Sequence, residues 1–200
     1  MLENVDCLGH ATVKIKNDLV IYIDPYKISD TEKADIILIT HDHYDHLSLQ
    51  DIKKIQKEET DIIIPSAAIE GVSGNVKEIN PGDSITVKGI DIKVVPAYNI
   101  KKKFHPKKKN YVGYIVKVHN ISYYHSGDTD RIPEMKNLNV DVAFLPVGGT
   151  YTMDAKQAAK ATEDIKPKVA VPLHYGSVVG TIEDAEEFKE LCDCEVRILY

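Results

Sequence analysis

The chain has 200 residues, a mass of 22.4 kDa and a formal net charge of −6. This length suits one domain with a full hydrophobic core, so we expect a single domain over residues 1–200. The hydrophobic fraction of 43% and the charged fraction of 28% exclude disordered and collagen-like chains. No apolar run is long enough to cross a membrane, and the acidic balance argues against a surface that coats nucleic acid.

The cysteine content and the amino-terminal residues predict the cellular location. The three cysteines are too few, and odd in number, for a disulfide framework. The first ten residues, MLENVDCLGH, contain no basic stretch followed by an apolar one, as a secretory signal would. Both features favour a reducing, cytoplasmic location.

In chain order, the first half of the sequence predicts strands and one helix. Residues 35–40 (DIILIT) form a β-branched run that is typical of a strand buried on both faces. Ser48 is expected to cap a helix that ends near Lys57, with Asp51 placed as in a capping box. The other strands are expected, from alternation or short apolar runs, at residues 11–16, 19–23, 61–64, 84–88 and 91–95.

The second half of the sequence begins with a hairpin and then alternates strands with helices. Helices are expected over residues 154–165 and 182–191. Strands are expected at residues 110–118, 121–125, 141–145, 168–171 and 195–199. The whole pattern predicts an α+β fold, a four-layer αββα sandwich in which two mixed β-sheets face each other beneath outer helices.

Several apolar runs end in polar residues that carry chemistry. These residues are His41, Asn99, Asp128, Thr150 and His174. Loops at the same ends of sheet strands are where rigid scaffolds usually place their functional groups. We therefore expect one shared cleft rather than five separate loops.

The most informative motif is HDHYDH at residues 41–46. Three imidazoles and a carboxylate on a tight turn cannot all pack into a core without partners. His41 and His43 lie two residues apart and face the same way in extended backbone, whereas Asp45 and His46 can turn toward a second point. The spacing predicts two ligand clusters for two adjacent divalent cations.

This motif and those after it resemble the metallo-β-lactamase superfamily. The pattern H-x-H-x-D-H is followed by Gly127-Asp128-Thr129 and Pro172-Leu173-His174, and the resemblance begins at Gly9-His10. Residues 23–26, 96–99 and 146–154 resemble, more narrowly, the small single-domain branch that includes the L-ascorbate-6-phosphate lactonases. The resemblance implies the metallo-β-lactamase fold and a metal-dependent hydrolase.

The resemblance also implies the roles of individual residues. His41 and His43 would bind the first metal, and Asp128 would bridge both metals. Asp45, His46 and His174 would bind the second. Two divalent ions are implied, with zinc favoured and manganese or iron as alternatives. Asp45 is also the implied catalytic residue, which would orient the attacking water.

Asn99 departs from the family pattern, because many members have a third histidine for the first metal at this position. An amide oxygen is a weaker ligand than an imidazole for ions such as zinc. Three alternatives remain: Asn99 contributes weakly, His105 in the following loop replaces the missing histidine, or water completes the site.

Three further residues are candidates for supporting roles. Asp24 either holds a ligand histidine or only caps the turn before Pro25. His125 precedes Ser126-Gly127-Asp128 in the sequence and is a candidate to support the ligands from behind. His10 is either a structural histidine or a residue of the cleft.

These residues predict a hydrolase that cleaves an ester, lactone or phosphodiester bond with a metal-activated hydroxide. Residues 101–109 hold six lysines and no acidic residue, and they either attract an anionic substrate or form a solvated loop. A small anionic molecule is the favoured substrate. The alternatives are a phosphodiesterase or nuclease on the same metal core, with the lysines holding phosphate, and a non-catalytic metal-bound binding or sensor module.

Overall fold

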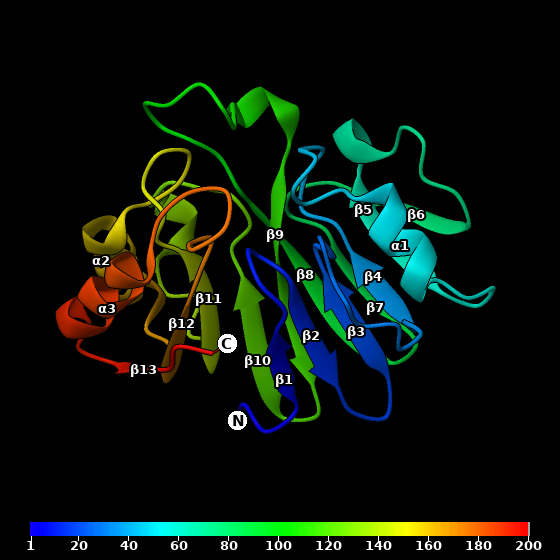
Figure 1. The fold of residues 1–200 in the computed structure, drawn as a ribbon, viewed down its shortest axis with the longest axis horizontal. Helices are drawn as coiled ribbons and strands as arrows, with labels where there is room; N and C mark the ends of the chain where they lie inside the picture. Colours follow the sequence, from blue (N-terminus) through cyan, green and yellow to red (C-terminus); the bar gives the residue numbers. More distant parts are fainter. Residues whose placement is uncertain (200) are drawn as a thin grey trace.

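The computed structural model, which describes residues 1–199, contains two mixed β-sheets that stack face to face with helices outside (Figure 1). In spatial order, the first sheet consists of β1 (Val5–Cys7), β2 (Val13–Lys16), β3 (Val20–Ile23), β4 (Ile36–Leu38), β5 (Asp61–Pro65) and β6 (Asn75–Ile79). The second consists of β13 (Glu195–Val196), β12 (Val169–Leu173), β11 (Val142–Pro146), β10 (Ile121–His125), β9 (Val112–Val118), β8 (Ile90–Pro96) and β7 (Ser84–Val87).

Each sheet has an antiparallel part and a parallel part. Strands β1 to β3 and β7 to β10 pair antiparallel, whereas β3 to β6 and β10 to β13 pair parallel. The parallel parts need crossover connections. Helices α1 (Leu49–Ile55), α2 (Ala155–Ile165) and α3 (Ile182–Leu191) lie in three of these connections. Short 3₁₀ helices are η1 (Ser66–Ala68), η2 (Lys107–Lys109) and η3 (Pro133–Met135).

Three apolar clusters fill the spaces between the four layers. Residues such as Leu38 and Tyr114 pack between the two sheets. Ile52 of α1 packs on the outer face of the first sheet, and Phe188 of α3 packs with α2 on the second. The α+β sandwich predicted from the sequence is confirmed. None of the helices within residues 1–199 is long and apolar enough to span a membrane.

Several element boundaries differ from the sequence predictions. Strand β4 spans three residues, not residues 35–40, and β13 ends at Val196 rather than at residue 199. Ser48 caps α1 through a bond from Asp51 N, but the helix ends at Ile55, before Lys57. Strands β1 and β6 were not predicted, because β1 has only three residues and β6, at a sheet edge, exposes most of its side chains.

The loops that follow β4, β8, β11 and β12 gather along one edge of the sandwich, at the top of Figure 1. Four of the polar residues that end apolar runs in the sequence, His41, Asn99, Thr150 and His174, belong to these loops. The fold therefore supports the expectation of one shared cleft.

Candidate metal centre

The histidine-rich motif forms a closed turn after β4. Backbone N–H groups of His46 and Leu47 both donate to His43 O, at 3.0 and 2.8 Å. His41, Asp45 and His46 are buried, and His43 is half-buried. The turn thus directs imidazoles and a carboxylate inward from one short segment.

A first cluster joins His41, His43 and His105. His43 Nδ1 lies 3.2 Å from His41 Nε2 and 3.1 Å from His105 Nε2, and one atom of each ring lies within 4.8 Å of the others. A neutral imidazole has one N–H and one lone pair. Three imidazole nitrogens that meet at one point therefore form a ligand set for a cation.

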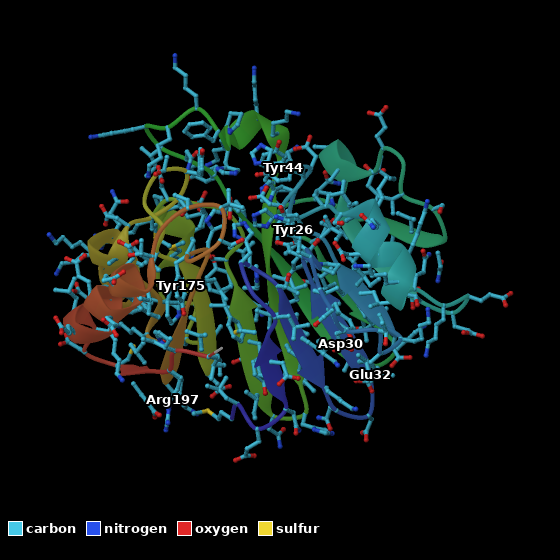
Figure 2. All side chains as sticks on the ribbon, viewed as in Figure 1. Tyr26, Asp30, Glu32, Tyr44, Tyr175 and Arg197 are labelled. Carbon is cyan, nitrogen blue, oxygen red and sulfur yellow. The ribbon has the colours of Figure 1, made fainter. Side chains whose placement is uncertain are left out.

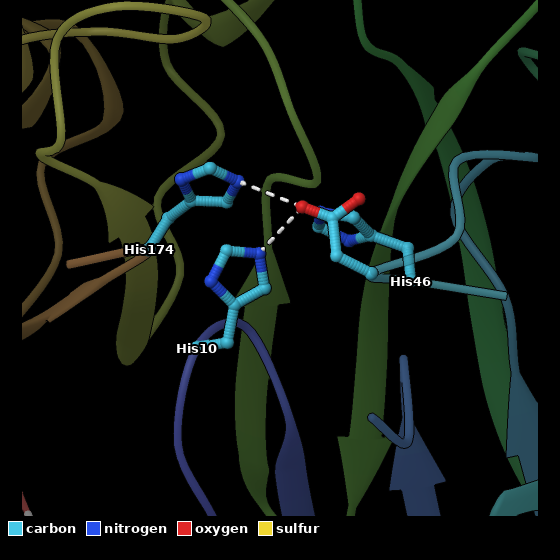
Figure 3. A group of neighbouring side chains, drawn as sticks. His10, His46 and His174 are labelled. Atoms are coloured by element: carbon cyan, nitrogen blue, oxygen red, sulfur yellow. Dashed lines mark hydrogen bonds and ion pairs between the residues drawn. The ribbon is translucent and has the colours of Figure 1, made fainter. Parts of the chain in front are cut away.

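A second cluster joins His10, Asp45, His46 and His174, whose ligand atoms also lie within 4.8 Å of one another. Figure 3 shows the rings of His10 and His174 directed at one carboxylate oxygen. This is Asp45 Oδ2, which lies 2.9 Å from His10 Nε2 and 4.0 Å from His174 Nε2. The cluster combines imidazole nitrogens with carboxylate oxygen.

Asp128 lies between the two clusters. Its Oδ2 is 3.3 Å from His105 Nε2 of the first cluster and 3.2 Å from His174 Nε2 of the second, and its Oδ1 is 3.4 Å from His46 Nε2. Gly127 has φ +61, and a Cβ there would lie 2.6 Å from Val112 O. Only glycine lets the chain approach β9 this closely and place Asp128 between the histidines.

The donor atoms of the two clusters are suited to binding cations. Among residues 1–199, the buried atoms that have no hydrogen-bond partner include His46 Nε2 and His174 Nε2. A buried polar atom without a partner costs ~1–3 kcal/mol, and a cation accepts such lone pairs. Imidazole nitrogens with carboxylate oxygens are the donors that zinc-like divalent ions prefer. The clusters are therefore able to bind metal ions.

Asp24 orients one histidine of each cluster. Its Oδ2 lies 2.8 Å from His46 Nδ1 and accepts a 2.6 Å bond from Thr40 Oγ1, which in turn lies 2.9 Å from His41 Nδ1. With these protons on Nδ1, the Nε2 lone pairs of His41 and His46 face the clusters. Asp24 thus stands directly behind His46 and, through Thr40, behind His41.

The side chain of Asn99 is used to hold His105. Asn99 Oδ1 accepts a 3.0 Å bond from His105 N and lies 3.2 Å from His105 Nδ1. Asn99 Nδ2 donates to Asp130 Oδ1 at 3.1 Å and to Tyr151 O at 3.0 Å. The structure therefore directs the imidazole of His105, not the amide of Asn99, toward His41 and His43.

Of the two other candidate histidines, His125 lies outside the clusters and His10 lies inside the second one. His125 Nε2 donates to Ala11 O at 2.8 Å, and its Nδ1 accepts from Gly127 N at 3.2 Å, so it braces the backbone before Asp128 without reaching a cluster atom. His10 lies inside the second cluster, and its backbone O accepts a 2.8 Å bond from His174 N. In the sequence, the only signal that His10 belongs to the cleft is its place after Gly9 and before a strand.

The pKa values of Asp45, Asp128 and His41 are lowered, whereas that of His46 is raised well above its ordinary value, because the charges of Asp128 and Asp24 outweigh the opposing effect of burial. Burial raises the pKa of Asp45, but the hydrogen bond from His10 and the charge of His46 lower it to about 2. Burial likewise opposes ionisation of Asp128, yet His174 and His46 hold its pKa well below the ordinary value. Burial and the neighbouring His46 lower the pKa of His41 well below its ordinary value. Ionised carboxylates and a neutral imidazole are the forms that bind metal.

A cavity of about 370 Å³ opens onto both clusters. Its inner wall includes His43, Asp45, His105, Asp128 and His174. Its mouth is formed by Tyr44, Phe104, Tyr151 and Val178, with Asp42 beside them. A substrate bound in this cavity would touch residues of both clusters.

The sequence and the fold are similar to those of known metal-dependent hydrolases. Residues 4–174 match the model of the beta-lactamase superfamily domain. The chain belongs to this superfamily. It is 37% identical to a UPF0173 metal-dependent hydrolase of Methanopyrus kandleri, over 96% of this chain and 94% of the relative. A UPF0173 metal-dependent hydrolase of Thermococcus kodakarensis is 34% identical, over 99% of this chain and 96% of the relative.

Solved structures agree with this membership. A crystal structure from Parabacteroides distasonis superposes with a TM-score of 0.88 at 36% identity, over 97% of this chain and 91% of that one. The metallo hydrolase Igni18 of Ignicoccus hospitalis superposes with a TM-score of 0.80 at 26% identity, over 98% of this chain and 94% of that one. The chain thus belongs to the UPF0173 metal-dependent hydrolases, which confirms the predicted enzyme class. The narrower resemblance to L-ascorbate-6-phosphate lactonases stays a prediction.

Proposed function

We propose that this protein is a two-metal hydrolase that cleaves an ester, lactone or phosphodiester bond of a small molecule. The observation that carries the proposal is Asp128, whose carboxylate lies 3.2–3.4 Å from imidazole nitrogens of both clusters. Bound divalent ions would lower the pKa of a shared water toward ~7 and polarise the oxygen of the scissile group.

Each cluster has its own ligand set in this proposal. His41, His43 and His105 would hold one ion, and Asp45, His46 and His174 the other, with Asp128 shared. The predominance of imidazole nitrogen favours zinc, with manganese and iron as alternatives. Cytoplasmic location also stays a prediction.

Asp45 is the residue to which we assign the orientation of the attacking water. It lines the cavity, and His10 Nε2 holds its Oδ2 at 2.9 Å. A carboxylate fixed in this way accepts a hydrogen bond from a water in one orientation and directs the water's oxygen at the substrate. His10 then acts as a positioning residue for Asp45.

A small anionic substrate is the favoured class. The support is the lysine-rich segment of residues 101–109, whose Phe104 and His105 line the cavity. Half of its charge is neutralised locally, since Lys102, Lys107 and Lys109 pair with Asp130, Glu134 and Asp42. This local pairing weakens the nuclease alternative, which needs several lysines available for phosphates.

Metal titration combined with hydrolysis tests the proposal. Metal-free protein is titrated with zinc by calorimetry, and the loaded protein is assayed on an aryl ester, a lactone and an aryl phosphodiester. We expect two equivalents to bind and at least one substrate to turn over. An Asp18→Ala variant, changed at a side chain that is 93% exposed, should behave as the wild type. Binding of two ions without turnover of any substrate would favour the sensor module instead.

A further inference from the structure

The mouth of the cavity carries aromatic and apolar side chains beside a charged centre. Tyr44 is 67% exposed and Phe104 47% exposed, and both line the cavity. Tyr151 and Val178 complete this rim from the loops after β11 and β12. Exposed apolar side chains are ordinary when scattered, but two exposed rings and two half-buried side chains around one cavity mark a binding surface. We call these four residues, three of them aromatic and one a valine, the aromatic rim.

The rings of the aromatic rim are held in place before any ligand binds. Phe104 and Tyr151 meet edge to face, with ring centroids 4.7 Å apart and an interplanar angle of 89°. Tyr44 packs against Tyr26 with centroids 5.9 Å apart, in the upper half of the molecule in Figure 2. A surface with fixed rings loses little conformational entropy when it binds a flat group.

The hydrogen bonds that anchor the rim also hold the first cluster. Tyr151 O accepts from Asn99 Nδ2, the amide whose oxygen contacts His105. Lys102 Nζ donates to Thr152 O at 2.7 Å. The distance between the rim and the metal clusters is therefore set by the same contacts, so a ligand can be positioned against both at once.

The charges beside the rim disfavour a second anionic group at the mouth. Within residues 1–199 no lysine or arginine lines the cavity, and its charged lining residues are Asp42, Asp45 and Asp128. Lys109 lies beside the mouth but is paired with Asp42. The part of a substrate that extends outward from the metals thus meets aromatic faces and a carboxylate, not a cation.

We infer that the aromatic rim binds a planar apolar group attached to the scissile ester or phosphodiester, so the substrate is charged at most at its reacting group. The inference rests on the proposed hydrolase function and specifies its substrate class. Stacking on Phe104 and Tyr151 distinguishes an aryl-substituted substrate from a methyl-substituted one with the same leaving group. A cavity of about 370 Å³ suits a molecule of this size.

Paired substrates and paired ligands test the inference. Phenyl p-nitrophenyl phosphate and methyl p-nitrophenyl phosphate release the same leaving group, so their kcat/KM ratio measures recognition of the second group. We expect the wild type to prefer the phenyl diester by about tenfold. Phe104→Ala should reduce this preference at least threefold, whereas Phe104→Leu should retain part of it. The matched control is Ile100→Ala, because Ile100 is 58% exposed in the same loop after β8 and outside the cavity lining.

A binding measurement separates this inference from the proposed function. Zinc-loaded protein is titrated with phenyl phosphate and methyl phosphate by calorimetry, and the phenyl ligand should bind about tenfold more tightly, with the difference lost in Phe104→Ala. If no aryl ester, lactone or phosphodiester is hydrolysed but the difference in binding holds, the proposed function is wrong and the binding role of the rim is supported. If the diesters are hydrolysed without a phenyl preference, and Phe104→Ala equals Ile100→Ala, the inference is wrong and the hydrolase stands.

Discussion

The two ligand clusters differ in how the chain builds them. The second cluster draws Asp45 and His46 from one turn, and its His46 is backed directly by the fully buried Asp24. The first cluster includes the half-buried His43 and depends on His105, which comes from a long loop and is held by the Asn99 amide. A carboxylate is a stronger partner for a histidine N–H than an amide is. We therefore expect the second cluster to bind its ion more tightly.

The largest expected effect follows from removing the residue that the clusters share. Asp128→Ala should lower kcat by more than ~100-fold, because it removes a candidate ligand from both sites. Losing a contact that only supports a ligand typically costs ~10- to 100-fold. Steady-state kinetics and metal content measured by mass spectrometry check this, with circular dichroism as the control for folding. Activity near the wild-type level at limiting metal would contradict the assignment of the centre.

A change at Asp24 should affect the second cluster more than the first. In Asp24→Asn, an amide nitrogen facing His46 Nδ1 no longer accepts its proton, which disfavours the form of His46 that offers Nε2. The affinity of the second ion should fall by ~10- to 100-fold, and that of the first by less, since Thr40 lies between Asp24 and His41. Competition with a coloured chelator measures both constants, and equal losses would show that Asp24 does not distinguish the sites.

A change at Asn99 should affect the first cluster alone. Asn99→Ala removes the contacts to His105 and Tyr151, so the first ion should bind ~10-fold more weakly. Asn99→His should not rescue the site, because an imidazole there cannot reproduce both contacts of the amide. The same chelator competition applies, with Ile100→Ala as the control, and a strengthened first site in Asn99→His would mean that position 99 reaches the ion itself.

The smallest effect should come from the lysine-rich segment. Lys101, Lys103 and Lys108 make no ion pair within residues 1–199, so replacing all three by Ser should lower kcat/KM for a phosphodiester by about threefold at low salt. Replacing the paired Lys107 and Lys109 should lower it less. The difference should shrink near 0.1 M salt, where the Debye length is ~10 Å. A loss for neutral esters that is independent of salt would indicate a structural role instead.

The fold was largely predictable because its signals are local. Helix α3 has the bounds predicted from periodicity, and α2 starts one residue after its predicted beginning, with Asp154 as its cap. The edge strand β1 was missed because three residues are too short for a pattern, and β6 because a strand that exposes most of its side chains leaves no apolar pattern. Their pairing depends on neighbouring strands from other parts of the chain.

The sequence by itself determined the candidate ligands that share one turn, since His41, His43, Asp45 and His46 lie within six consecutive residues. Only the tertiary structure decided which remote side chains join them. His105 reaches His43 across 62 residues of chain, and His10 reaches Asp45 across 35. Spacing along the chain predicts contacts within a turn, a strand or a helix. The long-range contacts at this centre depend instead on how the two sheets stack and how the loops at their common edge pack together.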